Sequence, residues 1–170
     1  DDTRLVGVAD SHQALLGRAE SEDHCRPHSN PESMLDSEEL DAVYIYADNA
    51  AGPELTEMAT SRGLHVLVEK PIAATQEEAH ELINLASSKN CVLMVGHIER
   101  FNPAVKALKE ELKEQSVLSI AITRVGPFPP RIGDVGIILD LGVHDIDIVR
   151  WLTESEIVST QGVFSRTQGE

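Results

Sequence analysis

Cysteine and basic residues are scarce in this chain of 170 residues, and long apolar runs are absent from it. Its two cysteines, Cys25 and Cys91, share no spacing motif, so we expect free thiols in a reducing compartment rather than a disulfide scaffold. No apolar run reaches the roughly 18 residues that predict a membrane-spanning helix. These absences exclude the disulfide-rich and membrane classes, and we expect a cytoplasmic protein.

The shortage of basic residues also limits the partners that the chain can bind. There are 14 Lys and Arg against 29 Asp and Glu, which gives a formal net charge of −15. Nucleic acid and anionic membranes both require a basic footprint, so the charge balance excludes them. A local cluster of arginines could still hold an anionic substrate.

His24, Cys25 and His28 are close together in the sequence, as the ligands of a metal ion often are. Pro27 lies between them, however, and no second pair of ligands follows at the spacing that structural zinc sites use. We therefore interpret these residues as loop residues and predict no metal site.

The chain does contain the composition of a globular domain and a regular alternation of strands and helices. Hydrophobic residues make up 41% of it and charged residues 25%, close to the globular average. Buried strands are predicted at 4–9, 41–47, 65–69 and 91–95, with helices at 12–20, 31–40, 53–62 and from Thr75 onward. This alternation is typical of an α/β fold with a doubly wound parallel sheet.

Capping residues mark the ends of several of these helices. Asn30 followed by Pro31 predicts one helix start. Ser11 and Thr75 predict two more, and Gly63 predicts a helix end.

After Gly96 the pattern changes. The predicted elements are a helix over 103–115, a β-branched strand over 117–125, a helix within 135–152 and a half-buried strand over 157–164. We therefore expect a domain boundary near Gly96 to Phe101, between a first domain over 1–98 and a second over 99–170.

Polar side chains follow two of the predicted strands, where ligands bind in open α/β sheets. Asp10 follows the first predicted strand of this chain. In dinucleotide-binding units, an acidic residue at the tip of the second strand holds the adenine ribose. The Gly-rich turn that normally precedes such a residue would lie upstream of Asp1, so we expect a piece of a longer protein. Glu69 and Lys70 end the strand of GLHVLVEKPI, where Lys70 is a candidate electrostatic catalyst, although a strand-edge ion pair with Glu69 would be ordinary.

A second candidate pair lies in the sequence DLGVH. Asp140 and His144 are four residues apart, so on a helix they share a face with Asp147. A carboxylate one turn before a histidine can orient the imidazole of a general base. A simple helix-surface pair explains the same spacing.

Four segments then occur in order: VAD ending at Asp10, VEKP around Lys70, GHIERFNP from Gly96 and DLGVHDIDIVRWL from Asp140. Together they resemble the glucose-fructose oxidoreductase and inositol dehydrogenase family of nicotinamide-dependent sugar dehydrogenases, over nearly the whole chain. The resemblance implies a partial dinucleotide-binding (Rossmann) domain over 1–98, whose Rossmann-like sheet lacks its first strand here. It further implies a partial substrate and oligomerisation domain over 99–170, which is part of an α/β domain with a mostly antiparallel sheet.

The same resemblance implies roles for individual residues. It places Lys70 between nicotinamide and substrate, with His144 as catalytic acid/base and Asp140 as its modulator. For the remaining site residues we expect the following: cofactor contacts from Asp10, Asn49, Glu69, Lys70 and His97, and substrate contacts from Arg100, Asn102 and Arg131. NAD is expected rather than NADP, because the Asp10 carboxylate repels a 2′-phosphate.

A narrower resemblance concerns the segment VGPFPPRIGDVGIILDLGVHDIDI. It is similar to the branch of the family that oxidises the 3-hydroxyl of UDP-N-acetylglucosamine. Arg124 and Arg131 flank the start of this segment and could bind phosphate, or could be ordinary surface residues.

One turn departs from the family. Members usually carry Thr-Pro after the strand at 41–47, with a histidine four residues after the proline, where this chain has Ala47, Asp48 and Gly52. A carboxylate near a pyrophosphate is repulsive, so we expect weakened cofactor binding.

Two functions therefore remain in view. The first is an enzyme that oxidises a secondary alcohol of a sugar or sugar nucleotide by hydride transfer, and that assembles as a homo-oligomer. The second is a non-catalytic relative that binds a partner or sugar nucleotide without turnover.

Overall fold

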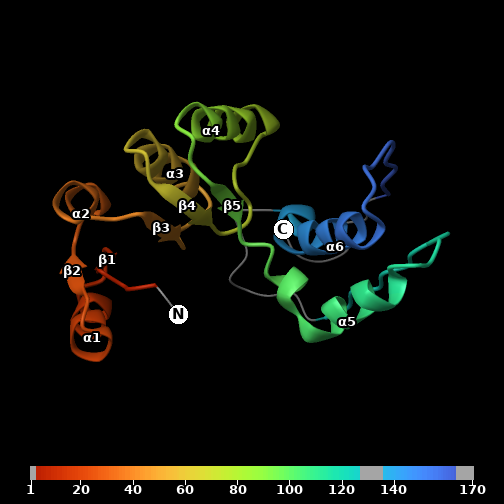
Figure 1. Ribbon diagram of the computed structural model, residues 1–170, viewed down its shortest axis with the longest axis horizontal. Helices are drawn as coiled ribbons and strands as arrows, with labels where there is room; N and C mark the ends of the chain where they lie inside the picture. The colour runs from red at the N-terminus through yellow and green to blue at the C-terminus, as the bar shows by residue number, and fades with distance from the viewer. Residues whose placement is uncertain (1–2, 127–135, 164–170) are drawn as a thin grey trace. The chain divides into compact units, whose positions relative to one another are not determined.

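The computed structural model describes residues 3–126 and 136–163. It divides into two compact units, Asp1–Gly96 and His97–Glu170 (Figure 1). Each unit is described separately below. None of the described helices is both long enough and apolar enough to cross a bilayer.

The first unit is built on parallel strands, which confirms the predicted α/β class. Two strands form one small sheet, β1 (Gly7–Ala9) and β2 (Arg26–His28). Three form a second sheet in the order β3 (Ala42–Ile45), β4 (His65–Val68) and β5 (Leu93–Val95). The sequence did not predict β2, because its three residues are Arg, Pro and His, which carry no apolar strand signal.

Four helices connect these strands: α1 (Gln13–Asp23), α2 (Pro31–Ser37), α3 (Gly52–Ser61) and α4 (Gln76–Ser88). Two predicted caps are confirmed, since Asn30 accepts backbone hydrogen bonds at the start of α2 and Thr75 accepts one at the start of α4. Gly63 takes a φ of 83° just after α3, which confirms the predicted helix end. The prediction for Ser11 is wrong, because α1 starts one residue later, with His12 as its N-cap.

Apolar side chains fill the space between the three-stranded sheet and its helices. Ile45, Val66 and Val68 are buried on one face together with Ala59 of α3. Figure 1 shows α3 and α4 on the same side of this sheet. The opposite face is more open, because Tyr44 is 59% exposed.

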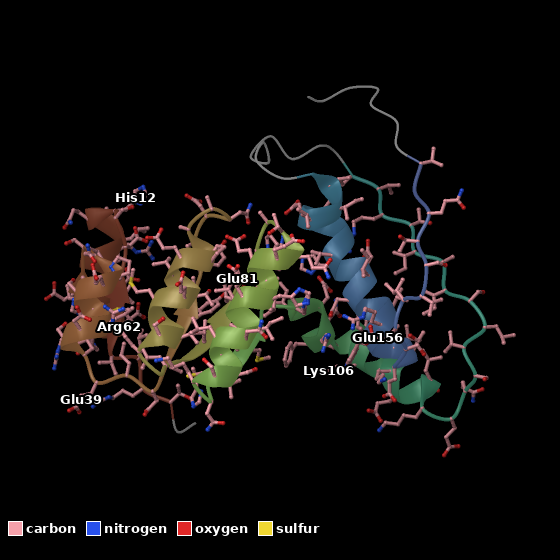
Figure 2. The ribbon with its side chains drawn as sticks, turned by 90° about the horizontal axis from the view of Figure 1, so that it is seen from above. His12, Glu39, Arg62, Glu81, Lys106 and Glu156 are labelled. Atoms are coloured by element: carbon pink, nitrogen blue, oxygen red, sulfur yellow. The ribbon has the colours of Figure 1, made fainter. Side chains whose placement is uncertain are left out.

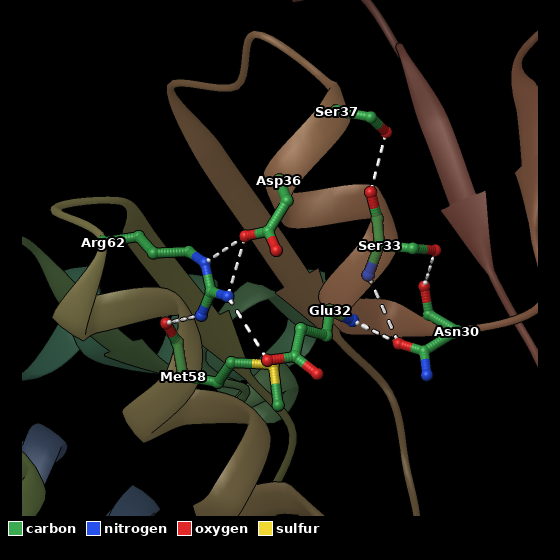
Figure 3. Close-up of polar contacts among 7 residues, drawn as sticks. All are labelled: Asn30, Glu32, Ser33, Asp36, Ser37, Met58 and Arg62. Carbon is green, nitrogen blue, oxygen red and sulfur yellow. Dashed lines mark hydrogen bonds and ion pairs between the residues drawn. The ribbon is translucent and has the colours of Figure 1, made fainter.

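A cluster of polar contacts joins α2 to the end of α3 (Figure 3). The Nε and Nη2 atoms of Arg62 both donate to Oδ1 of Asp36, at 2.9 and 2.8 Å. Nη1 of Arg62 donates to the carbonyl of Met58, and Nη2 lies 3.8 Å from Oε1 of Glu32. Arg62 therefore links α2, the helix between the two sheets, to the end of α3.

The second unit is helical in the part that the structure describes. It contains the 3-10 turn η1 (Ile98–Phe101), α5 (Pro103–Leu112), the π-helical turn η2 (Ile138–Gly142) and α6 (Val143–Thr153). Lys109 of α5 donates to the carbonyl of Trp151 and to Glu154, which ties α5 to α6. On the surface of α5, the ammonium of Lys106, labelled in Figure 2, lies 5.0 Å from the ring centre of Phe101.

The strands predicted in the second unit are not found. No strand is assigned over 117–125, or over the described part of 157–164. A strand exists only where backbone groups pair with a neighbour, and within the described residues these segments have no such partner. The mostly antiparallel sheet is therefore absent from the described part of this unit.

Candidate functional site

The carboxyl end of β1 presents Asp10 in a fixed conformation. The backbone N–H of His12 donates to Oδ1 of Asp10 at 2.7 Å, and Nδ1 of the His12 ring lies 3.1 Å from the same oxygen. The hydrogen bond from the His12 backbone is the main reason that the pKa of Asp10 lies below its ordinary value of 3.8. Asp10 is therefore ionised near neutral pH, and Oδ2 is not engaged by His12.

The turn after β3 is closed by its own backbone. The carbonyl of Asp48 accepts from the N–H groups of Ala51 and Gly52, at 2.9 and 3.1 Å. Asn49, a predicted cofactor contact, lies inside this turn. The altered positions Asp48 and Gly52 thus form the turn that leads into α3.

Glu69 and Lys70 follow β4 directly, as predicted, and the Lys70–Pro71 peptide bond is cis. Oε1 of Glu69 accepts a hydrogen bond of 2.7 Å from the Tyr44 hydroxyl on β3. The backbone N–H of Glu69 donates to the carbonyl of Ile45 at 3.0 Å. The end of β4 is therefore bound to β3 through both backbone and side chain.

Asp10, Asn49 and the Glu69–Lys70 pair all belong to the first unit, and each follows the carboxyl end of a parallel strand. Ligands bind at this end of the strands in open α/β sheets. The Asp10 carboxylate offers acceptor oxygens of the kind that ribose hydroxyls require, so the described residues fit the adenosine end of a dinucleotide.

In the second unit, two polar side chains lie against a buried carboxylate. Asp147 of α6 is 5% exposed. Arg100 donates to it through Nε at 2.7 Å and through Nη2 at 2.5 Å, a bidentate pair. His97 lies close by, with Nδ1 at 3.7 Å from Oδ1 of Asp147.

The charges in this cluster are set by burial and by the arginine. Burial raises the pKa of Asp147, but the hydrogen bonds from Arg100, aided by His97, outweigh it and hold the pKa below 3.8. Burial lowers the pKa of His97 below 6.5, against the opposing charge of Asp147. Asp147 is therefore ionised and His97 neutral near pH 7.

His144 lies on α6, but Asp140 does not share the α-helical spacing that the sequence predicted. Asp140 is in the π-helical turn η2, where the N–H of Val143 donates to the carbonyl of Ile138, five residues earlier. This wider turn changes which side chains lie above one another, so a regular α-helical turn does not relate the two residues, and their pairing stays a prediction. Among the described residues, no hydrogen bond reaches the buried Nδ1 of His144.

The remaining predicted residues either have partners within the second unit or lie outside the described residues. Asn102 caps α5 by accepting from the N–H of Ala104 at 3.0 Å, and its amide donates to Glu99. Arg124 forms a bidentate pair with Asp145, at 3.1 and 2.6 Å. Arg131 lies outside the described residues.

The described residues contain no group of three or more His, Cys, Asp or Glu side chains arranged to hold a metal ion. Cys25 is buried, with its thiol donating to the carbonyl of Ala19. His28 lies 3.0 Å from Oε1 of Glu38. These residues therefore have structural partners.

Sequence reasoning missed two residues of the site. Asp147 was noted only for its helix face, although the spacing HDID places a second carboxylate one turn after His144. Tyr44 lies within the strand predicted over 41–47, and no sequence signal shows which side chain it contacts. Its register opposite Leu67 brings it near Glu69, two residues further along β4.

Comparison with known proteins places this geometry in a family. Residues 1–97 match the oxidoreductase family with an NAD-binding Rossmann fold, and residues 125–170 match the GFO/IDH/MocA C-terminal domain. The chain is 33% identical, over 95% of its length, to a UDP-N-acetylglucosamine 3-dehydrogenase of Acidithiobacillus ferrooxidans. It is 32% identical, over 96% of its length, to an inositol 2-dehydrogenase of Saccharopolyspora erythraea.

The fold agrees with this assignment. The solved myo-inositol 2-dehydrogenase of Lactobacillus plantarum matches with a TM-score of 0.76 at 24% identity, over 89% of this chain and 49% of that one. The chain covers 50% of each of the two curated relatives. With the match over residues 1–97, its parallel α/β fold and its EKP and DLGVH segments, the chain belongs to the GFO/IDH/MocA oxidoreductase family.

Proposed function

We propose that this chain is part of a nicotinamide-dependent oxidoreductase that oxidises a secondary alcohol of a sugar or sugar nucleotide. The observation that carries the proposal is the placement of Asp10 and of Glu69–Lys70 directly after parallel strands, in a chain of this family. The relatives named for UDP-N-acetylglucosamine and for inositol support a polyhydroxylated substrate.

NAD is the proposed cofactor, and it would supply the hydride acceptor. Asp10 would hold the adenosine ribose through its carboxylate, which His12 already orients. A 2′-phosphate in this position would meet an ionised carboxylate, so NADP is disfavoured. Asn49, Glu69 and His97 are the other proposed contacts.

In the chemical step, His144 would accept the proton of the substrate hydroxyl. Support for this role comes from the position of His144 in the DLGVH segment of a chain of this family. Lys70 would stabilise the developing alkoxide, and Asp140 would modulate His144. Arg100, Asn102 and Arg131 are proposed around the substrate.

A second candidate function is supported by the turn after β3. Asp48 stands where the family usually has proline, and its carboxylate would oppose a pyrophosphate. This favours a relative that keeps the fold without turnover. The presence of Lys70, Asp140 and His144 together favours the enzyme.

Calorimetric titration of NAD and NADP separates these candidates. We expect the 170-residue chain to bind weakly or not at all, and the protein at the length of its relatives to bind NAD in preference to NADP. A dissociation constant below micromolar for the 170-residue chain would contradict the first expectation. No binding by the longer protein would favour the non-catalytic relative.

Substitution of His144 tests the mechanism directly. His144→Ala should abolish turnover in the longer protein, with NAD binding retained. His80→Ala is the matched control, because His80 is an exposed residue of α4. Unchanged activity of His144→Ala would remove this residue from the mechanism. We further propose that the protein is cytoplasmic. We also propose that it forms a homo-oligomer, and its mass in solution would test this oligomeric state.

A further inference from the structure

The Glu69 carboxylate is held against the open face of the three-stranded sheet. Tyr44 on β3 and Met94 on β5 flank Leu67 in register, so these side chains share one face. Glu69 follows Leu67 by two residues and belongs to the same face. The Tyr44 hydroxyl reaches it from the neighbouring strand and donates to Oε1 at 2.7 Å.

Gly96 confines the same carboxylate from the other side. A Cβ atom placed on Gly96 would lie 3.0 Å from Cδ and from both carboxylate oxygens of Glu69. Its backbone N–H donates to the carbonyl of Val68 at 2.8 Å, so Gly96 is bound to the end of β4. The carboxylate therefore lies between a hydroxyl from β3 and the backbone of Gly96 after β5, and a side chain at position 96 would require it to shift by a few tenths of an ångström.

The Tyr44 phenol remains a donor across the whole physiological pH range. Its hydrogen bond to Glu69, with smaller effects of burial and of the Glu69 charge, raises its pKa to about 12. The neighbouring Tyr46 is 81% exposed, and its ring lies 6.5 Å from the Tyr44 ring. Tyr46 is thus a chemically identical residue directly after the same strand, with no hydrogen bond to Glu69 among the described contacts.

We propose that Tyr44 is a positioning residue that fixes the Glu69 carboxylate next to Lys70, at the sheet edge where the nicotinamide end of the cofactor would lie. This inference rests on the proposed function and adds a residue to it. A glutamate side chain that is free to rotate occupies many conformations, whereas a tethered one presents its charge in one direction. Tyr44 acts through Glu69 and is not itself a catalytic residue.

The test compares Tyr44→Phe with Tyr46→Phe in the protein at the length of its relatives. Both changes keep the ring and remove one hydroxyl. We expect Tyr44→Phe to lower kcat about 10-fold, with the NAD dissociation constant changed less than about threefold, because alignment is lost while the carboxylate remains. Tyr46→Phe should leave both quantities unchanged.

A double-mutant cycle distinguishes positioning from general loosening of the sheet. In a Glu69→Ala background, Tyr44→Phe should have no further effect on kcat, because the group that it positions is already gone. An equal loss in both backgrounds would overturn the proposal, as would equal behaviour of the two phenylalanine variants.

A second readout does not depend on turnover. In the same protein labelled with ¹³Cζ-tyrosine, the signal that Tyr44→Phe removes should titrate near pH 12, and in Glu69→Ala it should return toward the ordinary value of 10.0. If Glu69→Ala left the titration of Tyr44 unchanged, the hydrogen bond between Tyr44 and Glu69 would be contradicted. No turnover in the unsubstituted protein would overturn the proposed function and the catalytic role of the contact. The titration would still show whether the contact exists, so the two failures can be told apart.

Discussion

Different interactions stabilise the interior of each of the two units of this chain. In Asp1–Gly96, parallel strands bury an apolar cluster that includes Ile45, Val66 and Val68. In His97–Glu170, Asp147 and Leu152 are the buried side chains among the described residues, and bidentate ion pairs join the segments. Among the described residues, apolar burial is therefore the main feature of the first unit and bidentate ion pairing that of the second.

The largest effect is expected where a buried apolar side chain of the first unit is truncated. Leu82 of α4 is 5% exposed, so Leu82→Ala should lower the free energy of unfolding by about 3 kcal/mol through lost burial and a residual cavity. Ile83, its exposed neighbour, is the control, and Ile83→Ala should change stability by less than about 1 kcal/mol. Hydrogen exchange of the β4 backbone amides would measure the free energy of unfolding of both variants. Equal effects would contradict an apolar core on this face.

Breaking the charge network of the second unit should have a smaller effect. Arg100→Ala leaves the buried Asp147 carboxylate without its bidentate partner, which we expect to cost about 2 kcal/mol. The guanidinium is 38% exposed, so water replaces part of the interaction and the cost falls below that of a fully buried pair. Fluorescence of Trp151, the single tryptophan of the chain, reports on α6 during denaturation.

Arg150→Ala provides the control for that experiment. Arg150 pairs with Glu156, whose side chain is 81% exposed, so its removal should change stability by at most about 0.5 kcal/mol. If both arginine variants were equally stable, the Arg100–Asp147 pair would not hold the second unit together.

A matched pair of helix caps sharpens the comparison further. Asn30 and Asn102 both precede proline and both accept backbone hydrogen bonds at a helix start, one in each unit. Replacement of either by Ala should cost about 1 kcal/mol, and by Gly only a few tenths. If Asn102 also contacts substrate, Asn102→Ala should raise KM in the longer protein while Asn30→Ala should not. Equal KM values would limit Asn102 to capping.

The smallest expected effect is a response of the second unit to acid. The folded-state pKa of His97 lies below 6.5, so its contribution to stability is lost as pH falls from above 6.5 toward that pKa. The pKa of Asp147 lies below 3.8, so its contribution is present above 3.8 and is lost as pH falls through the folded-state pKa. Trp151 fluorescence should therefore show falling stability below pH 6.5 and again below pH 4. Stability that is constant from pH 7 to pH 5 would contradict the buried, neutral state of His97.

Local signals allowed the first unit to be predicted well from sequence. The caps Asn30 and Thr75 act within a few residues of themselves, and the apolar runs of β3, β4 and β5 need no distant partner to be recognised. The strand predicted over 117–125 failed because β-branched composition cannot show whether a partner strand is present.

The site was only partly predictable for the same reason. Asp10, Lys70 and His144 stand in recognisable segments, but their partners do not. Arg100 and Asp147 are 47 residues apart, and Tyr44 and Glu69 are 25 apart, so the contacts depend on folding that local patterns do not encode. The π-helical turn at Asp140 likewise has no signal in the spacing DLGVH.

The contact between His12 and Asp10 has a consequence for kinetics. If Asp10 holds the ribose as proposed, a dinucleotide arriving at this strand end would find its acceptor in place, because the loop after β1 is already ordered around Oδ1 of Asp10. The free-energy cost of ordering the loop after β1 on cofactor binding would then be small. The rate at which the adenosine end docks would be governed by diffusion and orientation rather than by rearrangement of the loop, and differences in affinity between cofactors would appear in how fast they leave.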